Sequence, residues 1–453
     1  MHVSRPGEVP RPSVCAVNRD LRRDLYAAAA AALLVVTAAV VGTGIEHRNR
    51  SLYVPWPPLL AKWEPHIGPG TPAAIAVAVA VVIYGPTLAT RLPWRSLLFA
   101  AWGAGMAWTW SLALVDGWYR GVAQRLTTRN EYLQVIGRFQ DIPQTLRDFT
   151  QHIVSGPHDW PAHVAGHPAG ATVTFVLLDR IGLGGGGWAG AFVITVGTSA
   201  AAAVLVAVRA LADEQSARRA APFLVLLPGA VWVGASADGY FTGVAAWAVA
   251  FLALAVTGHR PRATGFVSGL LLGLTAYLSY GLTLFALIAA AVLLLGPRRT
   301  RPLPFLLAGL AVVPAVFTAL GFNWWEAYHL LVTRYYQGVG GVRPYSYWVW
   351  ANLACTVFIV GPATAAALRR TGAALVGRSP SPALRLAVLT TAALIAILVA
   401  DVSGMSKAET ERIWLPFAVW LLPACAFLTR QRAWLAAQAV LALLVNHLLW
   451  TWW

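Results

Sequence analysis

Four charged residues fall within six positions, at Lys407, Glu409, Glu411 and Arg412, in a chain that otherwise carries little charge. Arg412 directly precedes the apolar run IWLPFAVWLLP. An arginine at the start of such a run lies at the depth of lipid phosphates, and its planar guanidinium binds phosphate oxygens through paired donors. We therefore expect Lys407 and Arg412 to hold a phosphate, with Glu409 and Glu411 tethering or balancing these cations.

Carboxylates that could act as a general base come in one long polar segment, residues 116–186. Asp116 directly follows the apolar TWSLALV, so it lies at the membrane edge, where an ionisable residue is a functional candidate. A cap on the following turn explains Asp116 about equally well. Glu131, within the polar, acidic and aromatic triplet NEY, and Asp141 are the other acids of this segment placed to face the membrane.

Three histidines, His158, His163 and His167, follow in the same segment. Their spacing places them on no shared helix and is a weak match to a zinc site, so we predict no metal site. His167, in the stretch GHPAG, is instead expected to lie near the phosphate. The sequence indicates no cofactor, although a divalent metal is compatible with it.

A second group of candidates lies in residues 323–347, where arginines stand beside aromatic residues. Aromatic faces stack on the C–H groups of a sugar, while a guanidinium binds a neighbouring phosphate. A membrane-interface belt explains the tryptophans but not the arginines. We expect phosphate contacts from Arg334 and Arg343. Contacts to the sugar or acceptor are expected from a set that includes the turn GASADGYF: Asp238, Tyr240, Trp324, Trp325, Glu326, Tyr335 and Tyr345.

A helical membrane scaffold must position these residues. The 453 residues are 58% hydrophobic and 11% charged, against about 25% charged in soluble domains. Apolar runs of roughly 20 residues recur throughout and lack the alternation of strands. We predict an all-α polytopic protein of about 13 spans, at 25–44, 72–90, 97–115, 187–210, 220–236, 239–257, 263–279, 281–296, 303–321, 346–368, 383–401, 412–429 and 433–453.

The net charge of +16 reflects the orientation of these spans rather than nucleic-acid binding. With the N-terminus inside and the short apolar segment 167–182 not crossing, most of the 34 Lys and Arg residues lie inside, as the positive-inside rule requires. The loop 116–186 and the other candidates then share the outer face. We predict a plasma-membrane protein with an extracytoplasmic site, built from a cytoplasmic tail at 1–24, a hairpin at 25–95 and a main domain at 96–453.

The long outer loop is expected to be ordered. Segment 167–182 is expected to be a re-entrant or interfacial helix packed against protein. The apolar residues before it are spaced as on short amphipathic helices, broken at Pro143, that lie along the membrane surface: Leu126, Leu133, Phe139, Leu146 and Phe149.

Over about residues 97–430 the chain resembles the GT-C class of membrane glycosyltransferases, which take a sugar from a polyprenyl-phosphate carrier on the outer face. The resemblance rests on the long acid-bearing outer loop and on two motifs. GHPAG at 166–170 is similar to the HPPG or HPPL that ends this loop in many members. ERIWLPFAVWLLP at 411–423 is similar to the late RYxLPxxP pattern.

The chain also departs from that class. Its long loop follows the third predicted span rather than the first, HPAG lacks one proline, and the acidic pair expected near the loop start reads NE. If the loop after the first span is the true counterpart, Glu46 enters as a candidate. The catalytic acid therefore stays open among Asp116, Glu131 and Asp141.

The resemblance implies an inverting transfer in which a carboxylate takes the proton of an acceptor hydroxyl as it attacks C1 of the sugar. General-base assistance of this kind contributes typically 10²–10⁴ in rate. A groove between spans would take the prenyl chain. Cations would hold the departing phosphate, with His167 beside them: Arg334, Arg343, Lys407 and Arg412.

Arginine far outnumbers lysine and alanine is abundant, as in GC-rich genomes. Together with the resemblance, this implies an actinobacterial envelope enzyme. The expected donors are decaprenyl-phosphate arabinofuranose or mannose, and the acceptors arabinan, mannan or a glycolipid. A transporter or flippase of envelope lipid or polysaccharide is the alternative. It is expected to carry inverted repeats and mid-membrane charges, whereas charges here lie at span ends. A lipid-binding scaffold is the third class.

Overall fold

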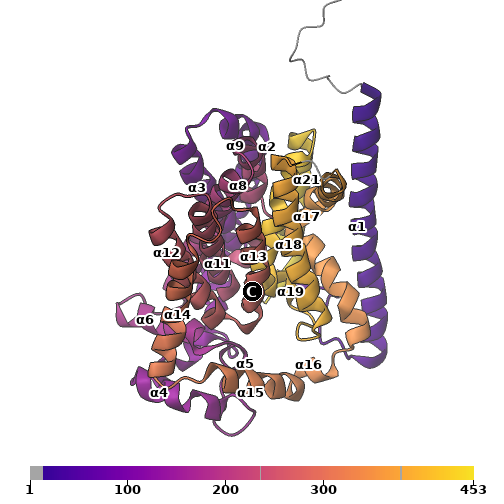
Figure 1. The fold of residues 1–453 in the computed structure, drawn as a ribbon. Helices are drawn as coiled ribbons and strands as arrows, with labels where there is room; N and C mark the ends of the chain where they lie inside the picture. The colour runs from indigo at the N-terminus through magenta and orange to yellow at the C-terminus, as the bar shows by residue number, and fades with distance from the viewer. Residues whose placement is uncertain (1–13, 235, 378–379, 453) are drawn as a thin grey trace, which may run out of the picture.

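The apolar runs form helices, because a backbone in hydrocarbon must satisfy its own hydrogen bonds. The structure, a computed structural model, describes residues 14–234, 236–377 and 380–452. Its longer helices run side by side in one bundle (Figure 1). They are α1 (Val14–Asn49), α2 (Thr71–Arg91), α3 (Trp94–Ala113), α7 (Gly186–Thr198), α8 (Ala200–Leu211), α9 (Glu214–Val225), α11 (Ala237–Val256), α12 (Pro261–Leu278), α13 (Phe285–Leu295), α14 (Leu303–Ala319), α17 (Tyr345–Val376), α18 (Pro382–Val402) and α21 (Gln431–Leu448).

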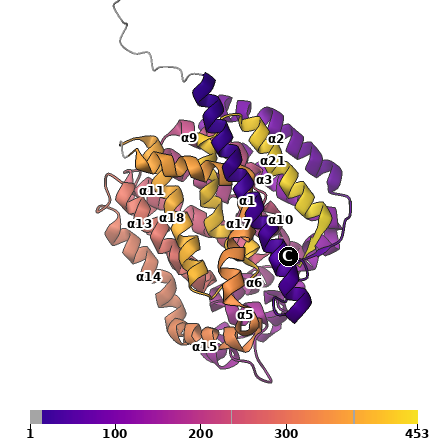
Figure 2. The same cartoon turned by 90° about the vertical axis from the view of Figure 1, so that its right-hand side faces the viewer.

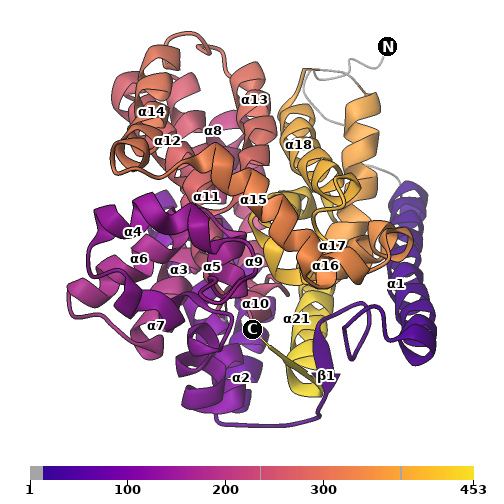
Figure 3. The same ribbon diagram turned by 90° about the horizontal axis from the view of Figure 1, so that it is seen from below.

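Short elements gather at one end of this bundle, where α4, α5, α15 and α16 lie below the long helices (Figures 1 and 3). The long loop supplies η1 (Leu114–Asp116), η2 (Tyr119–Ala123), η3 (Arg125–Thr127), η4 (Tyr132–Arg138), α4 (Ile142–Asp148), η5 (Phe149–His152), α5 (Ala162–Gly166) and α6 (Ala169–Arg180). Later segments supply α10 (Ala230–Val233), η6 (Tyr280–Leu284), α15 (Trp324–Gln337), α16 (Val339–Val342), α19 (Thr410–Ile413) and α20 (Leu415–Ala418). From α20, η7 (Val419–Phe427) runs away from this end through the bundle.

The prediction of an all-α membrane protein is confirmed. Among the described residues, seven helices are long and apolar enough to cross a membrane, or eight if the bent pair α14 and α15 is one span. The count of 13 spans stays a prediction. Two predicted spans, 220–236 and 412–429, are broken into shorter helices: α9 and α10 are separated near Pro228, and α19, α20 and η7 follow one another around Pro416 and Pro423.

The loop 116–186 is ordered, as predicted. Leu126, Phe139, Leu146 and Phe149 are all buried in the main core. Pro143 lies in the first turn of α4 and so begins a helix rather than breaking one.

Segment 167–182 does not have the length of a span. Its helix α6 has 12 residues, about 18 Å, against a hydrocarbon core of about 30 Å. Arg180 at its last turn donates to the carbonyls of Phe139 and Gln140, at 2.9 and 2.7 Å. The end of α6 is therefore bonded to the loop between η4 and α4.

The turns predicted to share the inner side lie together in the structure. Arg218 donates to the carbonyls of Ala89 and Leu92, and Arg219 to those of Ala426 and Leu428. Three segments far apart in the sequence therefore meet at the end of the bundle opposite α15.

Helix α1 lies along α17 at the edge of the molecule (Figures 1 and 2). Asp24, fully buried, accepts hydrogen bonds from Arg369 and Arg370 of α17 at 2.7 and 2.5 Å. The described part of the predicted tail 1–24 is thus already helical, and residues 1–13 lie outside the described range.

One small sheet joins distant parts of the chain. Strand β1 (Ala61–Trp63) pairs antiparallel with β2 (Leu449–Thr451), with Lys62 opposite Trp450. The predicted span 433–453 therefore ends as a helix at Leu448, because the residues after it pair with β1 instead.

Candidate functional site

The site is built around Arg412, which α19 holds in the buried interior. Its Nη1 donates to Asp238 Oδ2 at 2.8 Å, and its Nη2 to Glu409 Oε2 at 2.7 Å and His163 Nε2 at 3.0 Å. Asp238 comes from the first turn of α11 and His163 from α5. A buried guanidinium needs such partners, since an unpaired charge is costly there. We call Arg412 and its partners Asp238, Glu409, His163, Glu131 and Arg343 the Arg412 cluster.

Glu131 joins the cluster through His163. Its Oε1 lies 2.8 Å from His163 Nδ1, and the residue is only 3% exposed. Because an arginine always donates, His163 Nε2 must accept from Arg412, which leaves Nδ1 to carry the proton and donate to Glu131. The backbone fixes this arrangement as well, since His163 N donates to Asn130 O at 3.0 Å. A buried carboxylate therefore orients a neutral imidazole against a guanidinium.

Glu409 bridges two arginines. Its Oε1 lies 3.5 Å from Arg343 Nη1, while Oε2 binds Arg412. Burial opposes its charge, but Arg412 and Arg343 lower the pKa of Glu409 to about 2. Ala408 and Glu409 both have left-handed backbone, with φ of 70° and 61°, a conformation that costs non-glycine residues free energy and concentrates at functional sites.

Arg343 is itself held in place by backbone carbonyls. It donates to Leu52 O at 3.0 Å and to Lys407 O at 2.8 Å. Leu52, in the loop after α1, thus supports the cluster. The sequence candidate Glu46, in the last turns of α1, accepts from Leu52 N through its Oε2 at 2.9 Å.

Aromatic rings wall one side of the cluster. The Tyr132 ring lies 6.3 Å from that of His163, 5.8 Å from that of His167 and 5.4 Å from that of Phe175. His167 Nδ1 lies 2.8 Å from His163 O. Burial lowers the pKa of His167 to about 4, although Asp238 opposes this. His167 is therefore neutral at pH 7 and backs His163.

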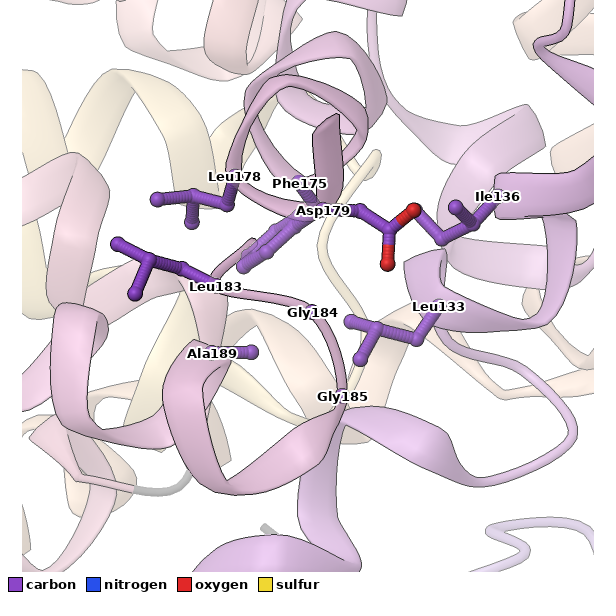
Figure 4. A pocket seen from close by; sticks show the side chains of 9 residues that line it. All are labelled: Leu133, Ile136, Phe175, Leu178, Asp179, Leu183, Gly184, Gly185 and Ala189. Carbon is purple, nitrogen blue, oxygen red and sulfur yellow. The ribbon is translucent and has the colours of Figure 1, made fainter. Parts of the chain in front are cut away.

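An apolar pocket opens behind this wall (Figure 4). The space within it that a water-sized sphere can occupy is about 10 Å³, close to the volume that one water molecule needs. Phe175, which stacks on Tyr132, forms one side of it. The other lining residues include Leu133, Ile136, Leu178, Leu183 and, at the rim, the exposed carboxylate of Asp179.

Asp116 belongs to a different group of charges. Its carboxylate lies 3.0 Å from Arg125 Nη2, 3.3 Å from His66 Nε2 and 3.5 Å from Arg120 Nε. Arg125 also donates to the carbonyl of Thr451 in β2. This group ties the C-terminal end of α3 to β2, and its named residues are not members of the Arg412 cluster.

The other candidate charges also have partners outside the cluster. Asp141 is exposed and caps α4, accepting from Gln144 N at 2.9 Å. Arg334 pairs with Asp159 at 2.7 Å. Lys407 Nζ donates to Gly340 O at 2.9 Å, away from Arg412.

The aromatic candidates mostly fix α15 and its neighbours. Trp324 donates to Ala276 O at 3.0 Å, Tyr335 to Gly404 O at 3.3 Å and Tyr345 to Val402 O at 3.1 Å. Trp325 and Glu326 are exposed at the start of α15. Tyr240 lies 3.3 Å from the Thr174 hydroxyl. Of the seven sugar or acceptor candidates, Asp238 is the one that binds Arg412.

The structure therefore brings together Glu131, Asp238, Arg343 and Arg412 from the sequence candidates, with His167 close by. The sequence marks His163 only as a possible metal ligand. No local pattern marks its role, since its partners lie on other segments. Within the described ranges, no group of three or more His, Cys, Asp or Glu side chains could hold a metal ion.

No protein-family model matches the chain, and no curated protein matches it in sequence. The structure is similar to that of the Archaeoglobus fulgidus oligosaccharyltransferase in complex with zinc and sulfate, at 16% identity and TM-score 0.44, over 77% of this chain and 51% of that one. It is also similar to the same enzyme tethered by a disulfide to an acceptor peptide with the NVT sequon, at 13% identity and TM-score 0.43, over 75% and 50%. The chain thus spans about half the length of these structures.

Proposed function

We propose that the protein is a membrane glycosyltransferase of the GT-C type, which moves a sugar from a polyprenyl-phosphate donor to a cell-envelope glycan or glycolipid. The observation that carries this proposal is the Arg412 cluster. The buried Arg343 and Arg412 both pair with the Glu409 carboxylate. Arg412 also contacts His163, which in turn contacts the buried carboxylate of Glu131. Transfer from a sugar phosphate needs these two parts, a holder for the departing phosphate and a group that removes a proton.

The phosphate of the donor is proposed to take the position of the Glu409 carboxylate. That carboxylate already lies between Arg343 and Arg412, and phosphate oxygens accept from guanidinium groups in the same way. Glu409 is also the more exposed partner of Arg412, with 20% of its side chain accessible against 6% for Asp238. Its backbone conformation, unfavourable for a glutamate, makes a rearrangement of this short segment less costly.

Glu131 is the proposed acid of the proton-transfer system, because it is the one among the three acidic candidates that reaches the Arg412 cluster. Asp238, on the opposite nitrogen of Arg412, is proposed to accept hydrogen bonds from sugar hydroxyls. Asp116 and Asp141 have other partners, an ion-pair group and a helix cap. Arg334 and the aromatic residues of α15 lie at the rim, where a polymeric acceptor would approach.

The donor proposed from the sequence is decaprenyl-phosphate arabinofuranose or mannose, and the acceptor arabinan, mannan or a glycolipid. The site is proposed to face the extracytoplasmic side of the plasma membrane. Support for the sidedness comes from the basic turns, which gather at the end of the bundle opposite α15. No cofactor is proposed.

The test is sugar transfer by the purified protein in lipid nanodiscs, with radiolabelled donors of both sugars and envelope acceptors. We expect transfer by the wild type, and a loss of about 10²–10³-fold in Arg412→Gln, the range for removing one group that stabilises transition-state charge. Arg299→Gln, an exposed arginine of the opposite end, is the matched control and should keep the wild-type rate. Movement of labelled lipid across vesicles without any transfer would instead indicate a flippase.

A further inference from the structure

We propose that His163, and not Glu131, takes the proton from the acceptor hydroxyl, an inference that rests on the proposed function. The two ring nitrogens of His163 face different partners. Nδ1 is bound to Glu131 Oε1 at 2.8 Å, whereas Nε2 faces Arg412 at 3.0 Å. Because Arg412 is the proposed phosphate ligand, Nε2 is the basic atom on the side where the sugar phosphate would lie.

Glu131 is poorly placed to accept the proton directly. Its residue is 3% exposed, and the oxygen that points toward the cluster is occupied by the imidazole. Its position behind the ring suits another role: a carboxylate that fixes the tautomer of a histidine and stabilises the imidazolium formed when that histidine accepts a proton. Glu131 is thus a positioning residue, and His163 the catalytic residue.

The proposed step balances as follows. The acceptor oxygen forms a bond to C1 of the sugar, and the bond between C1 and the phosphate oxygen breaks. The electron pair of that bond leaves with the polyprenyl phosphate, whose additional negative charge Arg412 and Arg343 hold. The acceptor proton moves to His163 Nε2, and the resulting imidazolium is paired with Glu131 until the proton is released to solvent.

The same contacts imply an order of events. In the structure Arg412 covers Nε2, so the imidazole is not available to an acceptor hydroxyl. When the donor phosphate draws the guanidinium toward itself, the hydrogen bond to His163 is released and Nε2 becomes accessible. His163 Nε2 is then accessible only when the donor is bound, so the acceptor hydroxyl meets the base only in the presence of the sugar phosphate.

His163→Gln is the decisive variant. A glutamine amide can donate to Glu131 and accept from Arg412, so it keeps both contacts that a structural histidine makes, but it does not accept a proton. We expect His163→Gln to fold with the wild-type melting temperature, to bind the radiolabelled donor, and to lose about 10²–10⁴-fold in transfer rate. The exposed His158 provides the control: His158→Ala should keep the wild-type rate.

Two further measurements separate proton transfer from structure. Imidazole added to His163→Ala should restore part of the transfer rate, while leaving Glu131→Gln unchanged. Transfer retained in His163→Gln but abolished in Glu131→Gln would overturn the inference and make Glu131 the base, with the proposed function intact. Absence of transfer in the wild type with every donor, under conditions where the protein is folded, would overturn the proposed function and this inference with it.

Discussion

Two acids that stand two residues apart, the half-buried Glu409 and the buried Glu411, have opposite surroundings. Glu409 lies between two arginines, which lower its pKa to about 2 against the effect of burial. Glu411 is fully buried, its Oε1 accepts from Leu60 N at 3.2 Å, and its Oε2 has no hydrogen-bond partner among the described residues. Burial raises the pKa of Glu411 to about 7. One short segment thus holds an acid that favours the charged form and one that favours the neutral form.

The pH dependence of stability should reveal Glu411. A carboxyl whose pKa is raised on folding stabilises the protein fully below its unfolded pKa of about 4.5, and this contribution is lost as pH rises through about 7. Glu411→Gln removes the buried charge, so we expect its melting temperature in detergent to exceed that of the wild type at pH 8 and to match it near pH 4.

Glu409→Gln is the paired control. Here the folded pKa is lowered, so the charged carboxylate stabilises the protein above pH 4.5 and the contribution is lost as pH falls toward about 2. The Glu409 variant should therefore be less stable than the wild type at pH 8. A Glu411→Gln variant that melts below the wild type at pH 8 would show that its neighbours compensate the buried charge.

The sequence predicts which residue types the candidate site contains, but it does not predict which of these residues contact one another. An arginine before an apolar run and an acid within a compact polar cluster are local signals, and they identify Arg412 and Glu131. His163 has no such signal, since its role depends on two contacts with segments distant in sequence. For Asp116 the sequence predicted a cost for an unpartnered acid, and the structure supplies partners from η3, η2 and residue 66.

Helix α17 is interrupted in the middle of the bundle. Gly361 has φ of 75°, a conformation that favours glycine, and Pro362 follows it. Gln438 of α21 repairs the break: its Nε2 donates to Val360 O at 2.7 Å, and its Oε1 accepts from Ala363 N at 3.2 Å. A single buried amide thus bonds to backbone groups on both sides of the kink, and the Val360 carbonyl also accepts from Thr364 Oγ1 at 2.8 Å.

Replacing that amide should destabilise the protein. In Gln438→Leu the side chain keeps a similar size, but the Ala363 amide loses its partner in an apolar setting, whereas the Val360 carbonyl keeps the hydrogen bond from Thr364 Oγ1 at 2.8 Å. We expect a loss of about 1–3 kcal/mol for the buried amide left unpaired, seen as a lower melting temperature in detergent. Gln151→Leu, an exposed position of the outer loop, is the matched control. An unchanged melting temperature in Gln438→Leu would mean that the helix closes without the amide.

Hydrophobicity along the sequence predicts where the helices lie, but it does not predict where a helix is interrupted. Each predicted span overlaps a helix, because an apolar run in a membrane has few other conformations. The breaks depend on local chemistry that a hydropathy pattern averages out. Between α14 and α15, for example, Gly321 has φ of 96°, Asn323 caps the new helix through Glu326 N, and the helices are bent by 78°.

The two ends of the bundle differ. We call the end opposite α15, which has short basic turns, the plain end, and the end that carries α15 the elaborate end. Arginines at one end donate to carbonyls of neighbouring turns, whereas the loop 116–186 and α15 lie at the other end (Figure 3). The Arg412 cluster and the group of charges around Asp116 both include residues of that loop. This arrangement agrees with the prediction from the sequence that the short basic turns share one side and the loop 116–186 lies on the other. The assembly of the Arg412 cluster from five separate segments was beyond the sequence, because only the packing of the helices sets which turns meet.

The sidedness can be measured directly by cysteine labelling in intact cells. In a Cys15→Ser background, the remaining Cys355 and Cys425 are buried. We expect Gln151→Cys and Thr333→Cys, both exposed at the elaborate end, to react with a membrane-impermeant maleimide. Arg299→Cys, exposed at the plain end, should react only after permeabilisation. The reverse pattern would place the site in the cytoplasm and contradict the proposed donor geometry.

The carboxylate of Glu409 is covalently attached beside Arg343 and Arg412. A tethered competitor of this kind acts at an effective concentration on the order of millimolar or more. An ordinary anionic phospholipid offers only its headgroup, so it exchanges one anion for another and gains little. A carrier that also brings a sugar and a long prenyl chain makes additional contacts and can displace the carboxylate. We therefore expect the resting site to discriminate against the abundant anionic lipids that surround it.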